Sequence, residues 1–165
     1  MISFSPLTDF REVISILSQI SLFGGATEPQ LEQILPRLQM GVIEKGDAVF
    51  EKGQEPSHIY IVKSGEIELL IPGGGIAIRK KSLGTGECFG QVAVMSMQNH
   101  AVSAVASERS EIIALSRRAM HQLRHENIEL FALLMMNIAR EMARRLKFTD
   151  EMLLNSHQVE VVFAP

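Results

Sequence analysis

The sequence predicts a mostly β protein with flanking helices, in which an antiparallel sandwich or barrel lies between two helical regions. Short apolar runs separated by glycines extend from Met40 to Leu115, a pattern typical of antiparallel strands and turns. Helical periodicity precedes this region, and a longer helical pattern follows it. With 165 residues, the chain is long enough for one domain with its own core.

Two helical segments are expected at the N-terminal end, within residues 10–38. In the first, Phe10–Ile20, apolar residues recur with a helical period: Val13, Ile14, Leu17 and Ile20. The stretch 21–25 breaks the pattern with two glycines. Thr27 then predicts a helix N-cap, with Pro29 inside the first turn and an apolar face that ends near Leu38.

The β region is expected to span residues 40–115. Its glycines stand at spacings typical of antiparallel turns: Gly46, Gly53, Gly65, Gly73, Gly74, Gly75, Gly84 and Gly86. The clearest strands are Ile59–Val62 and Glu66–Ile71, after which Pro72–Gly75 turns the chain. Three further runs complete the region: Ile76–Lys81, Val102–Ala106 and Glu111–Leu115.

The C-terminal region, residues 116–155, predicts two helices with polar caps. Ser116 caps a helix to about His125, and Asn127 caps a long helix to about Asn155, which is roughly 40 Å at 1.5 Å per residue. One apolar face of the long helix is expected to pack on its own domain: Leu130, Phe131, Leu134 and Ile138. A heptad seam forms a second face: Met135, Ala139, Met142, Leu146, Thr149 and Leu153. Two faces imply two partners, so we expect a homodimer through helix 128–154.

Composition excludes several classes of protein. A formal net charge of -3 argues against direct nucleic-acid binding, and one cysteine excludes an internal disulfide framework. The longest apolar run, Leu130–Met136, is far shorter than the roughly 20 residues that cross a membrane. The N-terminus resembles no signal peptide. We therefore expect a cytoplasmic protein that does not enter the membrane.

The segment 84–106 carries the strongest functional signal. Gly90-Gln91-Val92-Ala93 is expected to open a short helix whose first backbone N–H groups have no partner within the helix. Such a helix start attracts anions. Small residues at Gly90, Ala93, Ala101 and Ser103 would let a ligand approach the backbone.

This segment resembles the phosphate-binding cassette of cyclic nucleotide-binding domains, usually Phe-Gly-Glu-Leu-Ala-Leu followed by Pro-Arg-Ala-Ala-Thr. Turn-and-strand signatures of the family are matched at 44–47, 51–53 and 59–69, and the whole resemblance covers about 22–155. It implies a β jelly roll (a double-stranded β-helix) within a domain at 1–155, followed by a tail at 156–165. The implied ligand is cAMP, cGMP or another small anion.

The resemblance also implies the site residues. Phe89, Gly90, Gln91, Val92 and Ala93 would supply backbone N–H groups and the ribose contact, while His100, Ala101 and Ser103 would face the phosphate. The stretch Ala139–Asp150 resembles the dimer helix of bacterial catabolite activators, in which a Thr touches the purine base; Thr149 matches it.

Two cassette positions depart from the family pattern. Gln91 replaces the Glu that holds the ribose hydroxyl, and Asn99-His100 replaces the Pro-Arg whose Arg pairs with the cyclic phosphate. A lost charge-assisted hydrogen bond weakens binding by about 1.5–3 kcal/mol. We therefore expect weak cyclic nucleotide binding.

Neither catalysis nor a metal site is predicted. His121 and His125 stand four residues apart on a helix, but without a completing ligand they are expected to face solvent. The chain has no His-x-His pair of the cupin type and no readable Ser/His/Asp arrangement. Cys88 is expected to be buried, and the basic residues Arg140, Arg144, Arg145 and Lys147 to form a solvated, salt-bridged face.

Taken together, the sequence predicts a dimeric ligand-sensing regulatory module that signals through its long helix to a separate protein effector. Two alternatives remain open: an interaction or dimerisation domain with a vestigial pocket, or the sensory half of a transcription regulator. Ten residues after Asn155 are too few for a helix-turn-helix module, so a stand-alone domain and a truncated one both remain possible expectations.

Overall fold

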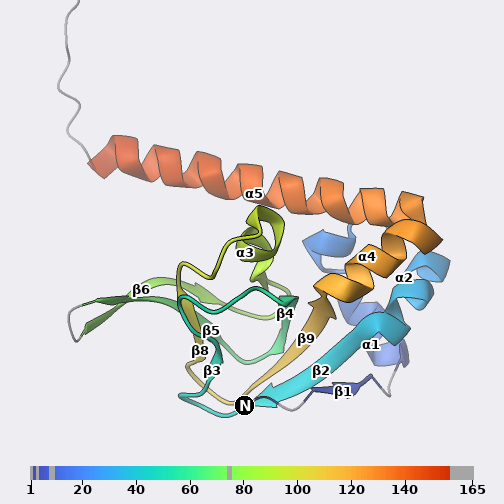
Figure 1. The fold of residues 1–165 in the computed structure, drawn as a ribbon, viewed down its shortest axis with the longest axis horizontal. Coiled ribbons are helices and arrows are strands. Elements are labelled where there is room, and N and C mark those ends of the chain that lie inside the picture. The colour runs from blue at the N-terminus through green and yellow to red at the C-terminus, as the bar shows by residue number, and fades with distance from the viewer. Residues whose placement is uncertain (1, 3, 8–9, 74–75, 157–165) are drawn as a thin grey trace, which may run out of the picture.

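The computed structural model describes residues 2, 4–7, 10–73 and 76–156. Its strands form a roll of two antiparallel sheets, with helices at one end and a long helix running past the roll (Figure 1). This confirms the predicted fold class: antiparallel sheets with flanking helices and a long C-terminal helix. None of the helices in these residues has the length and apolarity needed to cross a membrane.

The N-terminal region differs in detail from the prediction. It runs through β1 (Phe4–Pro6), α1 (Phe10–Leu17), η1 (Ser21–Phe23), α2 (Glu28–Ile34) and η2 (Leu35–Arg37). The first helix therefore ends at Leu17 rather than Ile20, and the second at Ile34 rather than Leu38. Pro36, which has no N–H and disfavours helix in the preceding residue, converts the last turn to a 3-10 helix. The predicted N-cap at Thr27 is confirmed, and it forms a capping box in which Gln30 Oε1 accepts from the Thr27 N–H at 2.9 Å.

The first strand, β1, lies outside the β region that the sequence predicted. β1 has only three residues and contains Pro6, so it carries no alternating pattern. It pairs with the edge of the larger sheet, where Phe4 lies opposite Gly41. A Cβ atom at Gly41 would stand 2.7 Å from Ile2 and 2.9 Å from Phe4. The N-terminal segment can therefore pack against β2 only because residue 41 has no side chain.

The two sheets contain nine strands. The larger has the order β1-β2-β9-β4-β7 and the smaller β3-β8-β5-β6, with every pairing antiparallel. Their bounds are β2 Leu38–Ile43, β3 Ala48–Phe50, β4 His58–Ser64, β5 Ile67–Gly73, β6 Ile76–Leu83, β7 Cys88–Phe89, β8 Ser103–Ala106 and β9 Ser110–Ser116. All five predicted strands are present, within a few residues of the expected ends. The turn expected at 72–75 lies partly outside the described residues.

Alternating side chains of the larger sheet divide the core in two. Ile59 and Ile61 of β4 belong to a cluster with the helices, whereas Tyr60 and Val62 belong to a cluster inside the roll. This alternation follows from the two-residue period of a strand that is buried on both faces. The roll interior and the helical core are therefore separate environments on opposite faces of the same sheet.

Two capped helices close the structure, as predicted. Ser116 Oγ accepts from the Ala119 N–H at 3.0 Å at the start of α4 (Arg117–Glu126). Asn127 Oδ1 accepts from the Leu130 N–H at 2.9 Å at the start of α5 (Ile128–Ser156).

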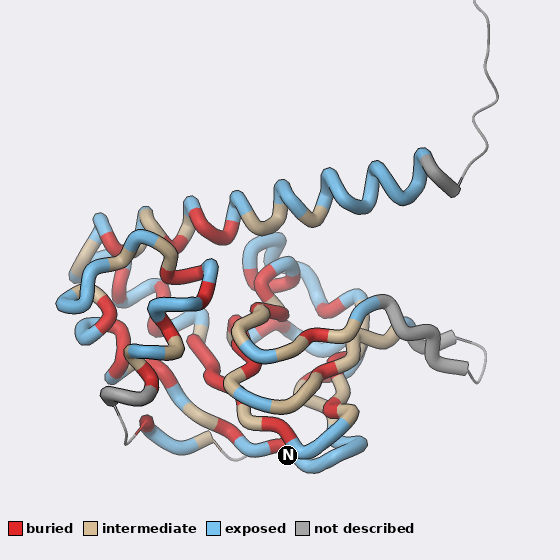
Figure 2. The backbone as a smooth tube through the Cα atoms, turned by 180° about the vertical axis from the view of Figure 1, so that it is seen from behind, coloured by how far each residue is buried: buried red, intermediate tan, exposed pale blue. Residues whose placement is uncertain are grey.

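The N-terminal part of α5 packs on the domain and its C-terminal part extends beyond it (Figure 2). The predicted inner face is confirmed: Leu130, Leu134 and Ile138 are buried, with Phe131 partly buried. The predicted seam is divided, because Met135 and Met142 partly pack on their own core, whereas Ala139, Leu146, Thr149 and Leu153 are exposed. The tail beyond residue 156 lies outside the described residues.

Candidate functional site

The cassette begins at a glycine that the backbone requires. After β7, Gly90 has φ +82° and serves as N-cap of α3 (Gln91–Ser96), confirming the predicted short helix. A Cβ atom here would stand 2.9 Å from the His58 carbonyl oxygen and 3.1 Å from the Tyr60 ring. Gly90 therefore provides both the left-handed turn and the close approach of the cassette to β4.

His100 is held between the cassette and β3. Its backbone N–H donates to Gln54 O at 3.0 Å, and its carbonyl accepts from the Gly53 N–H at 2.8 Å. Its ring stacks on Phe50, with ring centroids 3.6 Å apart and the planes within 11°. The side chain is only 5% exposed, and burial lowers its pKa below the usual value for histidine. The imidazole is therefore held in its neutral form at neutral pH.

The roll interior beside His100 is filled by aromatic rings. Phe50 lies 6.0 Å from Phe89 and 5.8 Å from Tyr60, and Tyr60 stacks on Phe89 at 5.2 Å. Phe4 and His58 extend the cluster on the other side of Tyr60. Burial raises the pKa of Tyr60. The predicted site residues Phe89 and His100 thus meet through Phe50, in surroundings that disfavour charge.

The other cassette residues have different environments. Ala93 is buried, whereas Val92 is 55% exposed and Ala101 is exposed. Ser103 Oγ accepts from the Lys52 N–H at 3.0 Å, which ties β8 to the turn after β3. The structure therefore brings 89–93 and 100–103 together around one end of the roll, and their role in binding a ligand stays a prediction.

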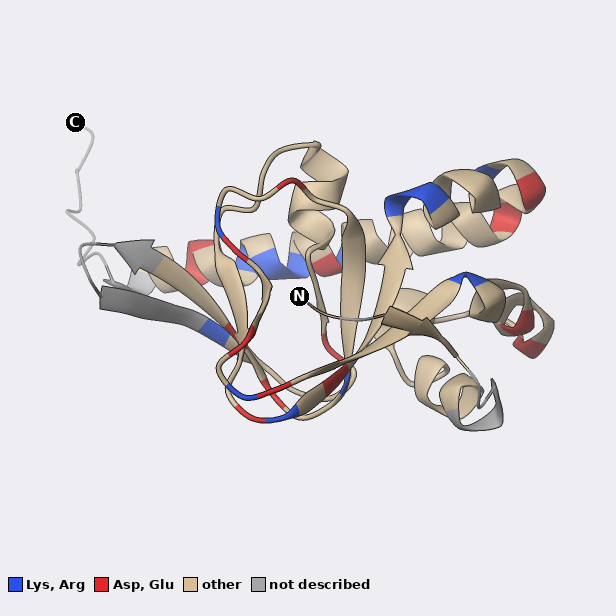
Figure 3. Ribbon diagram, turned by 60° about the horizontal axis from the view of Figure 1, so that its bottom comes forward, with Lys and Arg blue, Asp and Glu red and all other residues tan. Residues whose placement is uncertain are grey.

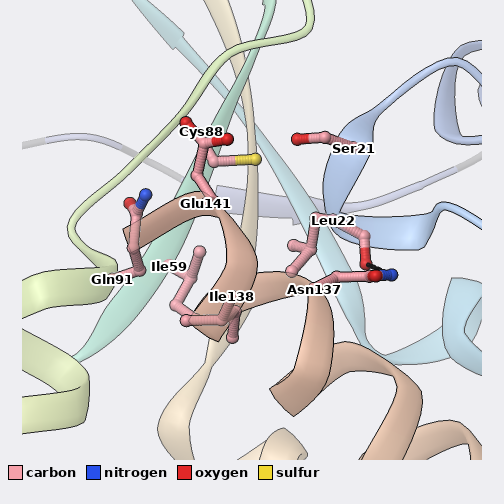
Figure 4. A pocket seen from close by; sticks show the side chains of 8 residues that line it. All are labelled: Ser21, Leu22, Ile59, Cys88, Gln91, Asn137, Ile138 and Glu141. Atoms are coloured by element: carbon pink, nitrogen blue, oxygen red, sulfur yellow. Dashed lines mark hydrogen bonds between the residues drawn. The ribbon is translucent and has the colours of Figure 1, made fainter. Parts of the chain in front are cut away.

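Gln91 faces α5. Its side chain is only 2% exposed, and Oε1 has no hydrogen-bond partner. It lines a small cavity together with residues of η1, β4, β7 and α5: Ser21, Leu22, Ile59, Cys88, Asn137, Ile138 and Glu141 (Figure 4). A buried acceptor without a partner is rare in folded proteins and identifies Gln91 as the unusual polar group of the cassette.

These features agree with the comparisons. Residues 41–127 match the family model of the cyclic nucleotide-binding domain, which is more than half of the chain and includes the cassette. The chain belongs to the cyclic nucleotide-binding domain family.

Similar proteins include a cyclic AMP receptor protein and a putative potassium channel protein. The cyclic AMP receptor protein of Thermus thermophilus is 31% identical over 130 residues, covering 78% of this chain and 58% of that protein. A putative potassium channel protein of Rhodopseudomonas palustris is 28% identical over 116 residues, covering 68% of this chain and 28% of that protein. This chain thus spans less than two thirds of the length of either relative.

A solved structure supports the fold over nearly the whole chain. A cyclic nucleotide-binding domain from Methylobacillus flagellatus superposes with a TM-score of 0.82 and covers 98% of this chain and 92% of that one. Sequence identity is 18%, so this likeness concerns the fold alone.

In the described part of this cyclic nucleotide-binding domain, no hydrogen bond joins the Thr149 side chain to the cassette. Its side chain is exposed, and Oγ1 donates to Arg145 O within α5 at 2.9 Å. Its predicted contact with a purine base stays a prediction.

Arg145 links α5 to the cassette, which the sequence did not indicate. Nη2 donates to Cys88 O at 2.8 Å, and Nε donates to Glu141 Oε1 at 2.9 Å. Burial favours a higher pKa for Glu141, but hydrogen bonds from Arg144 and Arg145 outweigh it and hold the pKa below its usual value. Arg145 was expected on a solvated face, and no sequence pattern marks a residue that reaches a backbone carbonyl 57 positions away.

The rest of the basic cluster behaves as predicted. Arg144 pairs with Glu141 at 2.9 Å and Lys147 with Glu151 at 3.7 Å, both on exposed parts of α5. Basic and acidic residues alternate along this part of the helix (Figure 3). Cys88 is buried, as expected, and burial raises its pKa to about 12. His121 and His125 are both exposed, and no cluster of three metal-binding side chains occurs among the described residues.

Proposed function

We propose that this chain is a non-catalytic, ligand-sensing regulatory module of the cytoplasm that binds a cyclic nucleotide or another small anion weakly. It passes the signal through α5 to a separate protein effector. The family match across residues 41–127 carries this proposal, because it spans the roll and the complete cassette.

The cassette supports weak rather than tight binding of a phosphate. His100 offers a buried, neutral imidazole stacked on Phe50, where the family pattern has a guanidinium. A neutral imidazole makes one hydrogen bond to a phosphate oxygen, whereas a guanidinium makes two and carries charge.

Gln91 would serve the other half of such a ligand only after its side chain turned from the cavity beside α5 toward the roll interior. Gln91 Oε1 is buried and has no partner, so a ligand hydroxyl that reached it would complete its hydrogen bonding. An amide accepts this bond without charge assistance, which again favours modest affinity.

Calorimetric titration with cyclic AMP and cyclic GMP tests the proposal. We expect weak binding by the parent protein and an affinity gain of about ten- to a hundredfold in His100→Arg, from a charged bond of about 1.5–3 kcal/mol. Gln91→Glu should add to this gain in the double variant. His125→Arg, the same change at an exposed site, is the matched control and should leave affinity unchanged.

The exposed apolar surface of α5 supports the proposed homodimer. Its C-terminal part exposes Leu146, Phe148, Met152, Leu153 and Leu154 by 53–65% each. One face of α5 packs on its own domain, and a second apolar face is exposed to solvent. A second copy of the chain would bury this exposed face. Leu146→Glu should therefore convert a sedimenting dimer to monomer, while Glu151→Gln on the same helix should not. A parent protein that is already monomeric at micromolar concentration would refute the dimer.

A second candidate function is supported by the aromatic cluster. Phe50, Tyr60 and Phe89 pack where a ligand would enter the roll, which suits an interaction or dimerisation domain without a ligand. If the double variant binds neither cyclic nucleotide at millimolar concentration, this candidate replaces the sensor.

A further inference from the structure

The cavity between the cassette and α5 is small, and its wall is mostly apolar with a few polar side chains along one edge. The space open to the centre of a water molecule is about 10 Å³, close to the volume that one water needs. Gln91, Glu141 and Ser21 place their polar ends on one side of it, and Ile59, Ile138 and Leu22 form the other (Figure 4).

Among the described residues, no group donates to Gln91 Oε1. Asn137 uses its side-chain N–H groups on Leu22 O at 3.0 Å and Gly24 O at 2.9 Å. Cys88 remains a thiol, which is a weak donor, and neither it nor the Ser21 hydroxyl, which also lines the cavity, forms a hydrogen bond to this oxygen. A donor from outside the described residues would therefore complete the hydrogen bonding of this acceptor.

Glu141 restricts which kind of molecule can supply the missing donor. Its carboxylate lines the same cavity and accepts from Arg144 and Arg145, which favour its ionised form. A carboxylate and an amide oxygen are both acceptors, so a molecule that bridges them must donate twice. Water donates two hydrogens and matches the cavity in size.

We propose that this cavity binds one water molecule, which donates to Gln91 Oε1 and to the Glu141 carboxylate. The water joins the first residue of α3 to α5, beside the direct bond from Arg145 to Cys88 O. Resting on the proposed function, this gives the cassette a means of acting on α5: a ligand hydroxyl that takes the Gln91 acceptor releases the water and weakens the link.

A crystal structure at a resolution that shows ordered water tests the site directly. We expect density within about 2.7–3.0 Å of Gln91 Oε1. A cavity without density, or a Gln91 side chain turned so that Oε1 meets a protein donor, would overturn the proposal. So would a monovalent cation, recognised by anomalous scattering in crystals soaked in a thallium(I) salt.

Hydrogen exchange tests whether the water holds α5. Gln91→Leu and Gln91→Met keep the side-chain volume but remove the acceptor. Each should raise amide exchange across 137–145 by about fivefold, the effect of one net hydrogen bond on local opening. Gln98→Leu, the same change at an exposed position of the cassette, is the matched control and should leave exchange unchanged. Unaltered exchange in both Gln91 variants would refute the link.

The two proposals fail separately. Crystallography and exchange are measured without any ligand, so a missing water leaves the ligand-sensing proposal in place. If the water is present in the parent protein but the double variant binds neither cyclic nucleotide, the sensing proposal fails and the water site remains.

Discussion

The two faces of the larger sheet show how one set of strands builds two different interiors. Toward the helices, Ile59, Ile61 and Ile113 pack with Leu134 and Ile138 of α5 in an aliphatic core. Toward the roll, Tyr60 and Phe89 pack with Phe50, and the ionisable rings of His58 and His100 join them. The strands are shared, so the difference lies only in alternate side chains.

The two faces of the sheet contribute differently to stability and to ligand recognition. The helical cluster contains no histidine or tyrosine among the described residues, and its cysteine, Cys88, has a pKa raised to about 12, so its burial is stabilising at neutral and acidic pH. The roll face holds two histidines whose pKa values are lowered by burial, and it contains the cassette glycine. The two titratable rings are thus concentrated on one face, whereas the other face anchors α5 and borders the cavity of Gln91 and Glu141.

The largest expected effect lies on the helical face. Leu134 is fully buried in the aliphatic core. Leu134→Ala should therefore lower the free energy of unfolding by about 2–5 kcal/mol, measured by urea denaturation. Met136→Ala, on the exposed side of the same helix, should change it by less than about 0.5 kcal/mol. Equal effects would contradict the packing of α5 described here.

A smaller effect is expected at the cassette glycine. Gly90→Ala combines a left-handed backbone with a Cβ atom 2.9 Å from the His58 carbonyl, so we expect about 2–3 kcal/mol of destabilisation. Gly46→Ala has a similar φ of +88° but no neighbour within 4 Å, and should cost about 1 kcal/mol. The melting temperatures of the two variants measure this difference. Equal melting temperatures would show that the close approach of Gly90 to β4 does not affect stability.

The pH dependence of stability should follow the roll face. Burial lowers the pKa values of His58 and His100 from 6.5, so the unfolded chain binds protons more readily than the folded one. This contribution to stability is complete above pH 6.5 and is lost as the pH falls toward the lowered values. His100→Phe, which keeps a ring beside Phe50, should make the melting temperature less sensitive to acid. If the melting temperature of this variant depends on pH as that of the parent protein does, His100 does not contribute to the pH dependence of stability.

The smallest effect is expected on ligand affinity. Protonated His100 attracts a phosphate more strongly than neutral His100, so cyclic nucleotide affinity should rise as the pH falls. The rise should extend below the usual histidine range, because burial lowers the pKa of His100 in the free protein. Calorimetric titration at several pH values across this range measures the cyclic nucleotide affinity. His100→Gln should abolish the dependence of that affinity on pH. Affinity that falls with acid would place the phosphate elsewhere.

Sequence alone determined most of the fold. Strand alternation, the caps at Thr27, Ser116 and Asn127, and the inner face of α5 are local patterns in which each residue type has a direct conformational reason. The cassette could also be found, because Gly90 and its neighbours are contiguous in the chain. The ends of α1 and α2 were not predicted, because a few residues near a proline give too weak a periodic signal. The strands β1, β2, β3 and β7 were not named either: β1, β3 and β7 have only two or three residues, and β2 begins at Leu38, where the helical pattern ends.

Tertiary structure alone decided what surrounds the cassette. The stack of His100 on Phe50, the bond from Arg145 to Cys88 O, and the cavity shared by Gln91 and Glu141 each join segments about 50 residues apart. No periodic pattern encodes such contacts, since they arise only when the roll closes and α5 returns across it. The sequence therefore located the cassette, whose role as a ligand site stays a prediction. The packing determined that its polar side chains Gln91 and His100 are buried and turned toward different interiors.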